Sequence, residues 1–344
     1  MKPLDELDPG GTARDLVVVG ASAGGVEALK RLVAGLPPDL PAAVCIVLHI
    51  SPGSPSALAG ILQRAGSLPC RFAGEDRPLH PGEIVVAPPD RHLVVEDGRV
   101  YLTVGPRENG HRPAVDVLFR TAAAARDSRV VGVILSGTRD DGAAGLAVIK
   151  ARGGAAVVQS PDDATYPGMP ASALANVAVD AVVPSGLIGK TIEAIVKGEQ
   201  LPEEAKSHHP DDDPDDGEPL TSVCPECGGV LSEKAEADVP YWECHVGHRY
   251  SPSSFAQAQA EGVEAALWTA VRSLRDRGAL LRRLAEQAEG RGRVHSAHRF
   301  REQASEAYTQ ADLVRETLAE VAATTLRGLP EPHPDDAAHT STGS

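Results

Sequence analysis

Nine consecutive residues decide how the first half of this 344-residue chain is expected to fold, namely Val17-Val18-Val19-Gly20-Ala21-Ser22-Ala23-Gly24-Gly25. The apolar run 16–19 predicts a buried strand, and residues 26–36 predict the helix that follows it. Between them, Ser22 stands in the pattern Gly-x-Ser-x-Gly, which is typical of a sharp turn from strand to helix. Such a turn exposes the serine hydroxyl at the carboxyl end of the strand, where N–H groups of the helix N-terminus can bind an oxyanion. The simpler alternative is a glycine-rich turn without chemistry, which doubly wound folds also contain.

Up to about residue 196, the chain alternates apolar runs with helical patterns. Strands are predicted at residues 16–19, 43–48, 84–87, 130–135, 155–158 and 181–183. Helices are predicted at residues 26–36, 56–64, 115–126, 143–152, 170–175 and 187–197. This alternation predicts an α/β domain with a doubly wound, mostly parallel sheet that is covered by helices on both faces. Within it, Asp97-Gly98 joins two alternating runs, 93–96 and 99–103, and predicts a β-hairpin.

The composition limits the classes of protein to which the chain can belong. Hydrophobic residues make up 42% and aromatic residues only 3%, so the core is expected to consist of Val, Leu, Ile and Ala. The net charge of −15 argues against nucleic acid as a partner. No apolar run reaches membrane-spanning length, and the polar N-terminus lacks the apolar core of a signal peptide. We therefore expect a soluble, cytoplasmic protein that is not embedded in a membrane, and its five cysteines are not expected to form disulfides.

Changes in composition divide the chain into parts. Residues 200–219 are almost all Pro, Asp, Glu and His, and such a segment cannot bury enough apolar surface to fold. Ser251-Pro252 is expected to start a helix, with the serine as its cap, and Gly290 and Gly292 separate this helix from a second one. The predicted parts are a flexible N-terminus (1–14), the α/β domain (15–199), an acidic disordered linker (200–219), a small zinc-ribbon-like module (220–250), an αα-hairpin (251–327) and a disordered tail (328–344).

Three side chains are predicted to meet at the carboxyl edge of the sheet. Ser22 follows the first strand, His49 ends the second, and Asp140-Asp141 follows the strand at 130–135. In parallel sheets, residues just past the strand ends converge on one crevice. There a histidine can take the serine proton, an aspartate can orient the imidazole, and backbone N–H groups can bind the oxyanion.

Two other kinds of site fit this pattern less well. The α/β-hydrolases have the chain order serine, acid, histidine, whereas the order here is serine, histidine, aspartate. A dinucleotide site of the type Gly-x-Gly-x-x-Gly would need glycine where Ser22 stands, because a side chain there obstructs the approach of the pyrophosphate.

Taken together, residues 15–196 resemble the catalytic domain of the chemotaxis protein-glutamate methylesterases (CheB-type). The motifs that carry the resemblance are Val-Gly-Ala-Ser-Ala-Gly-Gly at 19–25, Leu-His at 48–49, Ala-Pro-Pro-Asp-Arg-His-Leu at 87–93, Arg-Pro-Ala-Val-Asp-Val-Leu-Phe at 112–119, Leu-Ser-Gly-Thr-Arg-Asp-Asp-Gly-Ala-Ala-Gly at 135–145 and Tyr-Pro-Gly-Met-Pro at 166–170. This family hydrolyses γ-glutamyl methyl esters on chemoreceptor helices and often deamidates glutamines there.

The resemblance also implies roles for individual residues. Ser22 would be the nucleophile, His49 the general base and Asp141 the orienting acid. Asp141 is preferred over its neighbour because the family's aspartate immediately precedes the glycine. The backbone N–H groups of Ala23 and Thr138 would bind the oxyanion.

The chain departs from the family pattern in several respects, among them Ser51 where a proline is often found. Residues 137–142 read Gly-Thr-Arg-Asp-Asp-Gly where the family has Gly-Met-Gly-x-Asp-Gly, so Arg139 is expected to change the turn or the substrate groove. A receiver domain commonly precedes this catalytic domain. None is expected here, because the strand that carries Ser22 begins so early, and control by a phospho-aspartate in the same chain would be absent.

A second group of residues has the spacing of metal ligands. Cys224-x-x-Cys227 and Cys244-x-x-x-His248 can close a tetrahedral site, and His245 competes for the fourth position. Four protein ligands leave no open position, so we expect a structural zinc and no cofactor for catalysis. A module this short is expected to depend on the metal for most of its folding free energy.

These expectations lead to one main hypothesis and one alternative. The main hypothesis is a serine hydrolase that demethylates glutamates, and deamidates glutamines, on a methylated chemoreceptor or receptor-like protein. The helical hairpin would bind a methyltransferase or signalling partner, dimerise, or cover the catalytic domain as a lid. The alternative is a non-catalytic signalling scaffold that acts through its zinc module and hairpin.

Overall fold

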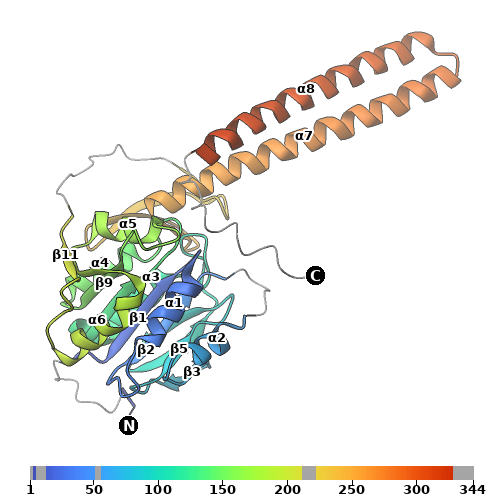
Figure 1. Ribbon diagram of the computed structural model, residues 1–344. Coiled ribbons are helices and arrows are strands. Elements are labelled where there is room, and N and C mark those ends of the chain that lie inside the picture. The colour runs from blue at the N-terminus through green and yellow to red at the C-terminus, as the bar shows by residue number, and fades with distance from the viewer. Residues whose placement is uncertain (1–2, 5–12, 51–55, 211–221, 328–344) are drawn as a thin grey trace, which may run out of the picture. The chain divides into compact units, whose positions relative to one another are not determined.

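Strand β1 (Leu16–Ala21) lies near the middle of an eight-stranded sheet whose order is β11-β10-β9-β8-β1-β2-β5-β3 (Figure 1). Every pair of neighbouring strands is parallel except β10 and β11. The other strands of this sheet are β2 (Ala43–Leu48), β3 (Cys70–Phe72), β5 (Ile84–Val86), β8 (Val130–Ile134), β9 (Ala155–Gln159), β10 (Val179–Val183) and β11 (Lys206–His208). On one side of β1 lie β2, β5 and β3, and on the other lie the later strands β8 to β11, so β1 marks the point at which the strand order reverses.

The computed structural model describes residues 3–4, 13–50, 56–210 and 222–327. Parts of the predicted N-terminal segment and acidic linker, and the predicted tail at 328–344, lie outside the described residues. The chain divides into two compact units, Met1–Ala258 and Gln259–Ser344.

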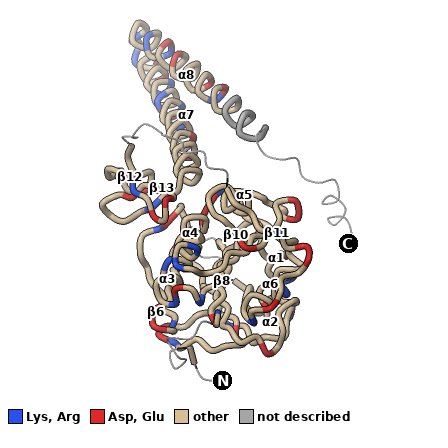
Figure 2. Tube along the Cα trace, turned by 90° about the vertical axis from the view of Figure 1, so that its left-hand side faces the viewer, with Lys and Arg blue, Asp and Glu red and all other residues tan. Residues whose placement is uncertain are grey.

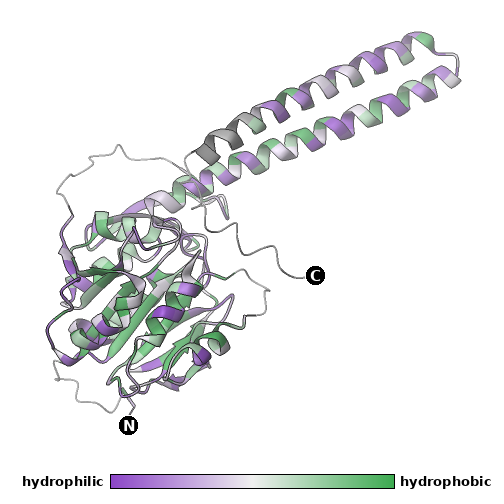
Figure 3. Cartoon of the chain, in the orientation of Figure 1, coloured by the Kyte–Doolittle hydropathy of each residue, from purple (hydrophilic) through white to green (hydrophobic). Residues whose placement is uncertain are grey.

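Helices cover both faces of the sheet and confirm the doubly wound architecture (Figure 1). Side chains of β1 alternate between the two layers, because Val17 packs in the same cluster as Leu29, whereas Val18 packs in the cluster that contains Phe119. Figure 3 shows the apolar central strands between these helices. One layer contains α1 (Gly25–Ala34), α2 (Leu58–Ala65) and α6 (Ser185–Lys197), and the other contains α3 (Val115–Arg126), α4 (Ala143–Ala151) and α5 (Gly168–Asn176).

A second, antiparallel sheet confirms the predicted hairpin. Strands β6 (His92–Glu96) and β7 (Arg99–Thr103) pair directly, and β4 (Arg77–Pro78) adds to β7. Asp97 and Gly98 both have positive φ angles, 47° and 74°, as a tight two-residue hairpin turn requires.

The composition of residues 200–219 predicted a disordered linker, but residues 206–208 within it form β11. This strand pairs antiparallel with β10 at the edge of the main sheet. His208 adds a side-chain contact, because its Nε2 lies 3.0 Å from the carbonyl oxygen of Leu174. An edge strand needs only backbone pairing on one side, so a polar, low-complexity sequence can occupy it.

A three-stranded antiparallel sheet forms the small module after the linker. It consists of β12 (Leu231–Glu236), β13 (Val239–Cys244) and β14 (Arg249–Tyr250). Trp242, Tyr250 and Phe255 form its small core together with two of the cysteines. Val239 is buried in the core cluster of the large sheet, so the module packs against the α/β domain as part of the same compact unit.

Two long helices, α7 (Pro252–Gly290) and α8 (Val294–Arg327), form the predicted αα-hairpin. At the turn between them, Gly292 has a φ of 69°. Figure 2 shows basic and acidic residues along both helices. The guanidinium carbon of Arg282 lies 4.3 Å from the centre of the Tyr308 ring. Small side chains let the helices approach closely, and the buried ones are Ala285, Ala288, Ala297, Ala304, Ala307 and Ala311. Within the described part of the chain, no helix combines the length and the apolar character needed to cross a membrane.

Two glycines of the same helix provide a test of the packing between α1 and α6. A Cβ added at Gly189 would lie 2.5 Å from the backbone carbon of Gly35, whereas one added at Gly186 would meet nothing within 4 Å. We expect Gly189→Ala to lower the free energy of unfolding by about 1–3 kcal/mol, because the two backbones must move apart. Gly186→Ala should leave it unchanged or raise it slightly. Urea denaturation of both variants measures the difference, and equal stabilities would contradict this account.

Candidate active site

Ser22 and His49 stand next to each other at the carboxyl edge of the sheet. The last register pair of β1 and β2 is Ala21 with Leu48, and each of the two residues follows directly. The backbone N–H of His49 donates to the carbonyl of Ala21 at 3.1 Å, which continues the ladder by one step. On the other side, the N–H of Ser22 donates to the carbonyl of Ser136, after β8, at 2.9 Å. Ser22 therefore lies at the point where the strand order reverses.

Glycines allow the backbone to turn tightly around Ser22. Gly24 has a φ of 71°, in the left-handed region that side chains disfavour. A Cβ added at Gly137 would lie 2.9 Å from the Cβ of Ser22 and 2.1 Å from the sulfur of Met169. The loop after β8 thus passes directly over the serine, and only glycine fits at the crossing.

The predicted oxyanion donors lie on the two loops beside Ser22. Among the described residues, no hydrogen bond engages the backbone N–H of Ala23 or of Thr138, and Thr138 is exposed. The hydroxyl of Ser136 donates to the carbonyl of Ala23 at 2.8 Å and thereby fixes the first loop. Arg139, which stands where the resemblance expects a glycine, has a φ of 67°, in the left-handed region that glycine adopts most easily.

His49 and Asp141 form a buried pair. The Nε2 of His49 lies 2.7 Å from Oδ2 of Asp141, and the two side chains are 5% and 1% exposed. A carboxylate only accepts hydrogen bonds, so the imidazole donates from Nε2 and carries its lone pair on Nδ1. Within the described residues, this Nδ1 is buried and has no hydrogen-bond partner. The arrangement leaves Nδ1 available as a base.

Asp141 is held by donors from several directions. At the start of α3, the backbone N–H of Val115 donates to Oδ2 at 2.7 Å, and that of Asp116 donates to Oδ1 at 3.1 Å. The side-chain amide of Asn109 donates to Oδ1 at 2.9 Å. Burial alone would raise the pKa of Asp141, but the hydrogen bond and charge of His49 outweigh it and hold the pKa well below its usual range. The carboxylate therefore stays ionised beside the imidazole.

A second histidine lies against His49. The rings of His49 and His111 stack with centroids 3.6 Å apart and an angle of 11° between their planes. Burial, reinforced by the neighbouring His49, lowers the pKa of His111 to about 3, so this ring stays neutral at physiological pH. Sequence reasoning did not find His111, although it immediately precedes the motif at 112–119.

Two other aspartates near the site have different surroundings. Asp140 is hydrogen-bonded to the hydroxyls of Ser251 and Ser254. Asp116 is buried and accepts the backbone N–H groups of Gly142 and Gly145. Burial and the charge of Asp141 raise the pKa of Asp116 well above its usual value.

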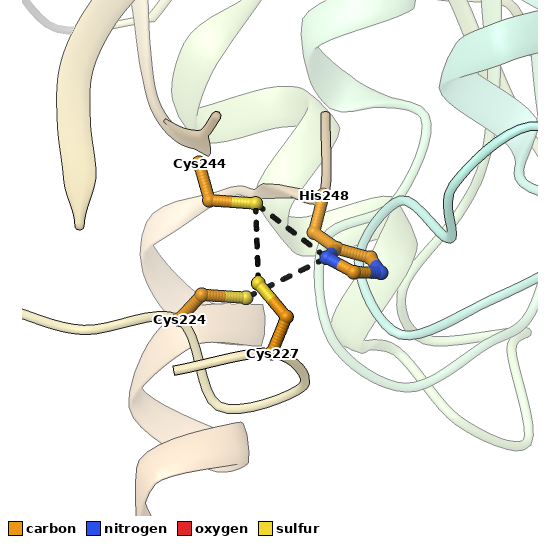
Figure 4. A group of neighbouring side chains, drawn as sticks. All are labelled: Cys224, Cys227, Cys244 and His248. Carbon is orange, nitrogen blue, oxygen red and sulfur yellow. Dashed lines mark hydrogen bonds between the residues drawn. The ribbon is translucent and has the colours of Figure 1, made fainter. Parts of the chain in front are cut away.

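The four predicted metal ligands gather in one cluster, shown in Figure 4. All of their ligand atoms lie within 4.8 Å of one another. The sulfurs of Cys227 and Cys244 are 3.7 Å apart, and Nδ1 of His248 is 3.5 Å from the sulfur of Cys244. Tetrahedral zinc with Zn–S of about 2.3 Å and Zn–N of about 2.0 Å would separate these atoms by about 3.8 and 3.5 Å. The cluster therefore has the dimensions of a four-coordinate zinc site. His245 lies outside it, exposed and against Gly229.

Comparisons with known proteins agree on the region that contains Ser22, His49 and Asp141. The family model described as CheB methylesterase matches residues 17–192. A protein-glutamate methylesterase/protein-glutamine glutaminase of Anaeromyxobacter dehalogenans is 39% identical over 183 residues, which cover 53% of this chain and 54% of that protein. A putative enzyme of the same name from Leptospira interrogans is 38% identical over 170 residues, covering 49% of this chain and 88% of that protein.

A solved structure matches the same region. The Thermotoga maritima CheB methylesterase catalytic domain has a TM-score of 0.50 and 31% identity, and the match covers 52% of this chain and 97% of that one. The chain spans about half the length of several curated relatives that it matches. The matched residues include the whole serine turn and both loops that surround it, and they make up slightly more than half of the 344 residues. The chain therefore belongs to the CheB methylesterase family.

Proposed function

We propose that this protein hydrolyses glutamate γ-methyl esters on chemoreceptor-like signalling proteins, with Ser22 as the nucleophile. The observation that supports this most strongly is the buried imidazole of His49. One of its nitrogens is bound to Asp141, and the other has no partner among the described residues. His49 follows the strand next to that of Ser22 at the same level, so its free nitrogen is the natural acceptor for the serine proton.

The reaction would proceed in two steps. Ser22 Oγ attacks the ester carbonyl, and its proton passes to Nδ1 of His49. The backbone N–H groups of Ala23 and Thr138 stabilise the tetrahedral oxyanion. The intermediate expels methanol, which takes the proton from His49, and leaves an acyl-enzyme. Water, activated by His49, then attacks the acyl-enzyme, releases the glutamate carboxylate and restores Ser22.

Two neighbours of His49 favour this proton transfer. The ionised Asp141 stabilises the imidazolium that forms in each step. His111 stays neutral, so it adds no positive charge beside that imidazolium. The same machinery would deamidate a glutamine if ammonia left in place of methanol. None of the five cysteines, all of which lie within the described residues, forms a disulfide, which fits our proposal of a cytoplasmic location.

Replacing the nucleophile gives the most direct test. We expect Ser22→Ala to lower methanol release from a methylated chemoreceptor by at least about 1,000-fold, because no other group can form the acyl-enzyme. It should also abolish labelling by a fluorophosphonate probe. Ser305→Ala, which removes an exposed hydroxyl on α8, serves as the control and should behave like the wild type. A wild-type protein that neither labels nor releases methanol would favour the scaffold hypothesis.

The stacked histidine provides a second test. We expect His111→Phe to label within about threefold of the wild-type rate, because an aromatic ring still supports His49. His111→Ala leaves the imidazole unsupported on that side and should label about tenfold more slowly, since such aromatic pairs contribute about 0.5–1.5 kcal/mol. The measurement is the rate of labelling by the fluorophosphonate probe for the wild type and both variants under identical conditions. A phenylalanine variant as slow as the alanine variant would show that stacking is not what His111 provides.

We also propose that the Cys3His cluster holds a structural zinc ion. Burial raises the pKa of the Cys244 thiol, but hydrogen bonds from the backbone N–H groups of His248 and Val246 bring it down to about 6. A thiolate, the form that binds metals, is therefore favoured at neutral pH. The Nε2 of His248 lies 3.6 Å from a carboxylate oxygen of Glu226, a partner of the kind that orients metal-bound histidines.

Metal content distinguishes the two candidate histidines. We expect purified wild-type protein to contain one zinc ion per chain by elemental analysis, and Cys224→Ser and His248→Ala to lose it. His245→Ala should keep it, because His245 lies outside the cluster. Full zinc content in His248→Ala would contradict the proposed ligand set.

A further inference from the structure

The segment that follows the Cys3His cluster packs against the loops that hold Asp141. Three residues after His248, Ser251 is buried at 6% exposure, and Ser254 is buried at 1%. Both lie at the start of α7, within the same compact unit as the large sheet. This part of the chain lies outside the region that matches the family, which ends at residue 192. Contacts between this segment and the loops around Asp141 therefore come from outside the matched region.

Asn109 connects this segment to the candidate active site. Its side-chain NH2 group has two hydrogens, and these are donated to Asp141 and Asp116, both at 2.9 Å. Its side-chain oxygen accepts the backbone N–H of Ser251 at 2.8 Å and lies 3.0 Å from the Ser251 hydroxyl. Its own N–H donates to the carbonyl of Arg249 at 2.8 Å. The amide plane of Asn109 is thus fixed on one side by residues 222–258, here called the C-terminal extension, and directs its hydrogens toward Asp141 and Asp116 on the other.

Asp140 forms a second connection, one residue before Asp141. Its Oδ1 lies 2.6 Å from the hydroxyl of Ser251 and 2.7 Å from that of Ser254, and its Oδ2 accepts the N–H of Ser253 at 3.0 Å. A carboxylate at this position satisfies free N–H groups of the helix start and interacts favourably with the helix dipole. The first turn of α7 therefore binds the loop that carries Asp141 as well as the loop that carries Asn109.

Ser251 is not used as an ordinary helix cap. The sequence predicted that its hydroxyl would cap α7, and Pro252 does begin the helix. Its hydroxyl instead contacts Asn109 and Asp140, and the carboxylate of Asp140 takes over the capping of α7. The side chain of Ser251 thus binds the loops that carry Asn109 and Asp141 instead of capping its own helix.

Further contacts hold the loop 108–111 against the module. Glu108 pairs with Arg249 in a β-bridge. Both of its carboxylate oxygens lie 2.8 Å from Nη2 of Arg120, which donates to them. Arg120 also lies 3.4 Å from a carboxylate oxygen of Glu236 in β12. The same loop carries both Asn109, which binds Asp141, and His111, which stacks on His49. The C-terminal extension therefore supports a contact of each member of the His49–Asp141 pair.

We propose that Ser251 is a positioning residue for the hydrolytic reaction, acting through Asn109 on Asp141, so that the C-terminal extension is a working part of the active site. This inference rests on the proposed function, because it assigns a purpose to the orientation of Asp141. Loss of the Ser251 hydroxyl removes one of the two contacts of the Asn109 side-chain oxygen, which keeps the backbone N–H of residue 251. It also removes one of the three hydrogen bonds of the Asp140 carboxylate, which keeps those of Ser253 and Ser254. The Asn109 amide and the loop that carries Asp141 are then held less tightly on this side, so Asp141 keeps its donors but its orientation relative to His49 is less precisely fixed.

The test uses the full chain with Ser251→Ala, the hydroxyl-bearing variant Ser251→Thr, and Ser273→Ala, which removes an exposed hydroxyl on the same helix. We expect Ser251→Ala to label with the fluorophosphonate probe about 10- to 100-fold more slowly than the wild type, since small displacements of catalytic groups have effects of this size. On methylated receptor, kcat should fall while KM stays unchanged. Ser251→Thr should recover most of the rate, and Ser273→Ala should match the wild type.

A double-mutant cycle shows whether the effect passes through Asn109. If it does, Ser251→Ala combined with Asn109→Ala should be no slower than Asn109→Ala alone. Losses that multiply in the double variant would overturn the proposal, as would a Ser251→Ala protein that labels at the wild-type rate. Should Ser251→Ala not fold by circular dichroism, Ser251→Cys replaces it, because it keeps the size of the side chain with a much weaker donor, and the same slowing is expected. An unlabelled wild type would instead refute the proposed function itself.

Discussion

The structure of the candidate active site depends on one constraint, the burial of a charged carboxylate. Asp141 is 1% exposed, and an ionised group so far from water is tolerated only when hydrogen-bond donors surround it. The donors come from the start of α3, from the amide of Asn109 and from the ring of His49. Each donor belongs to a different segment, so the carboxylate fixes those segments relative to one another while it orients the imidazole.

The parallel sheet brings the remaining groups to the same place. Because β1, β2 and β8 are neighbours with the same direction, the loops that follow them start at one edge. Gly137 lets one of these loops pass over Ser22 at a separation that any side chain would block. The site therefore combines a rigid frame of buried apolar strands with two loops whose shape depends on glycine.

Much of this arrangement could be predicted from sequence, because it follows from local patterns. Apolar runs that alternate with helical periodicity predicted the strands, helices and layers, and the strand ends indicated where Ser22 and His49 would lie. The spacing of Cys224, Cys227, Cys244 and His248 predicted a cluster whose dimensions fit zinc. Short edge strands were missed, as with β11, because pairing along one edge leaves no periodic signal in a polar sequence.

Contacts between distant segments left no such signal. The stacking of His111 on His49 depends on the path of a loop, and the side chain of Asn109 lies 142 positions before the serine that it contacts. The acidic linker predicted a module joined to the α/β domain only through that linker. Its composition carries no information on the contact that Val239 of the module makes in the core of the large domain. Pairs of this kind become visible only when the topology is known.

The shared amide of Asn109 has an evolutionary consequence. Both of its hydrogens are committed to aspartates and its oxygen to Ser251, so no atom of that group is spare. Because the hydroxyl of Ser251 also lies 3.0 Å from that oxygen, substitutions at positions 109 and 251 should be inherited together. A descendant that shed the C-terminal region would keep this arrangement around Asp141 only after recruiting another donor for that oxygen.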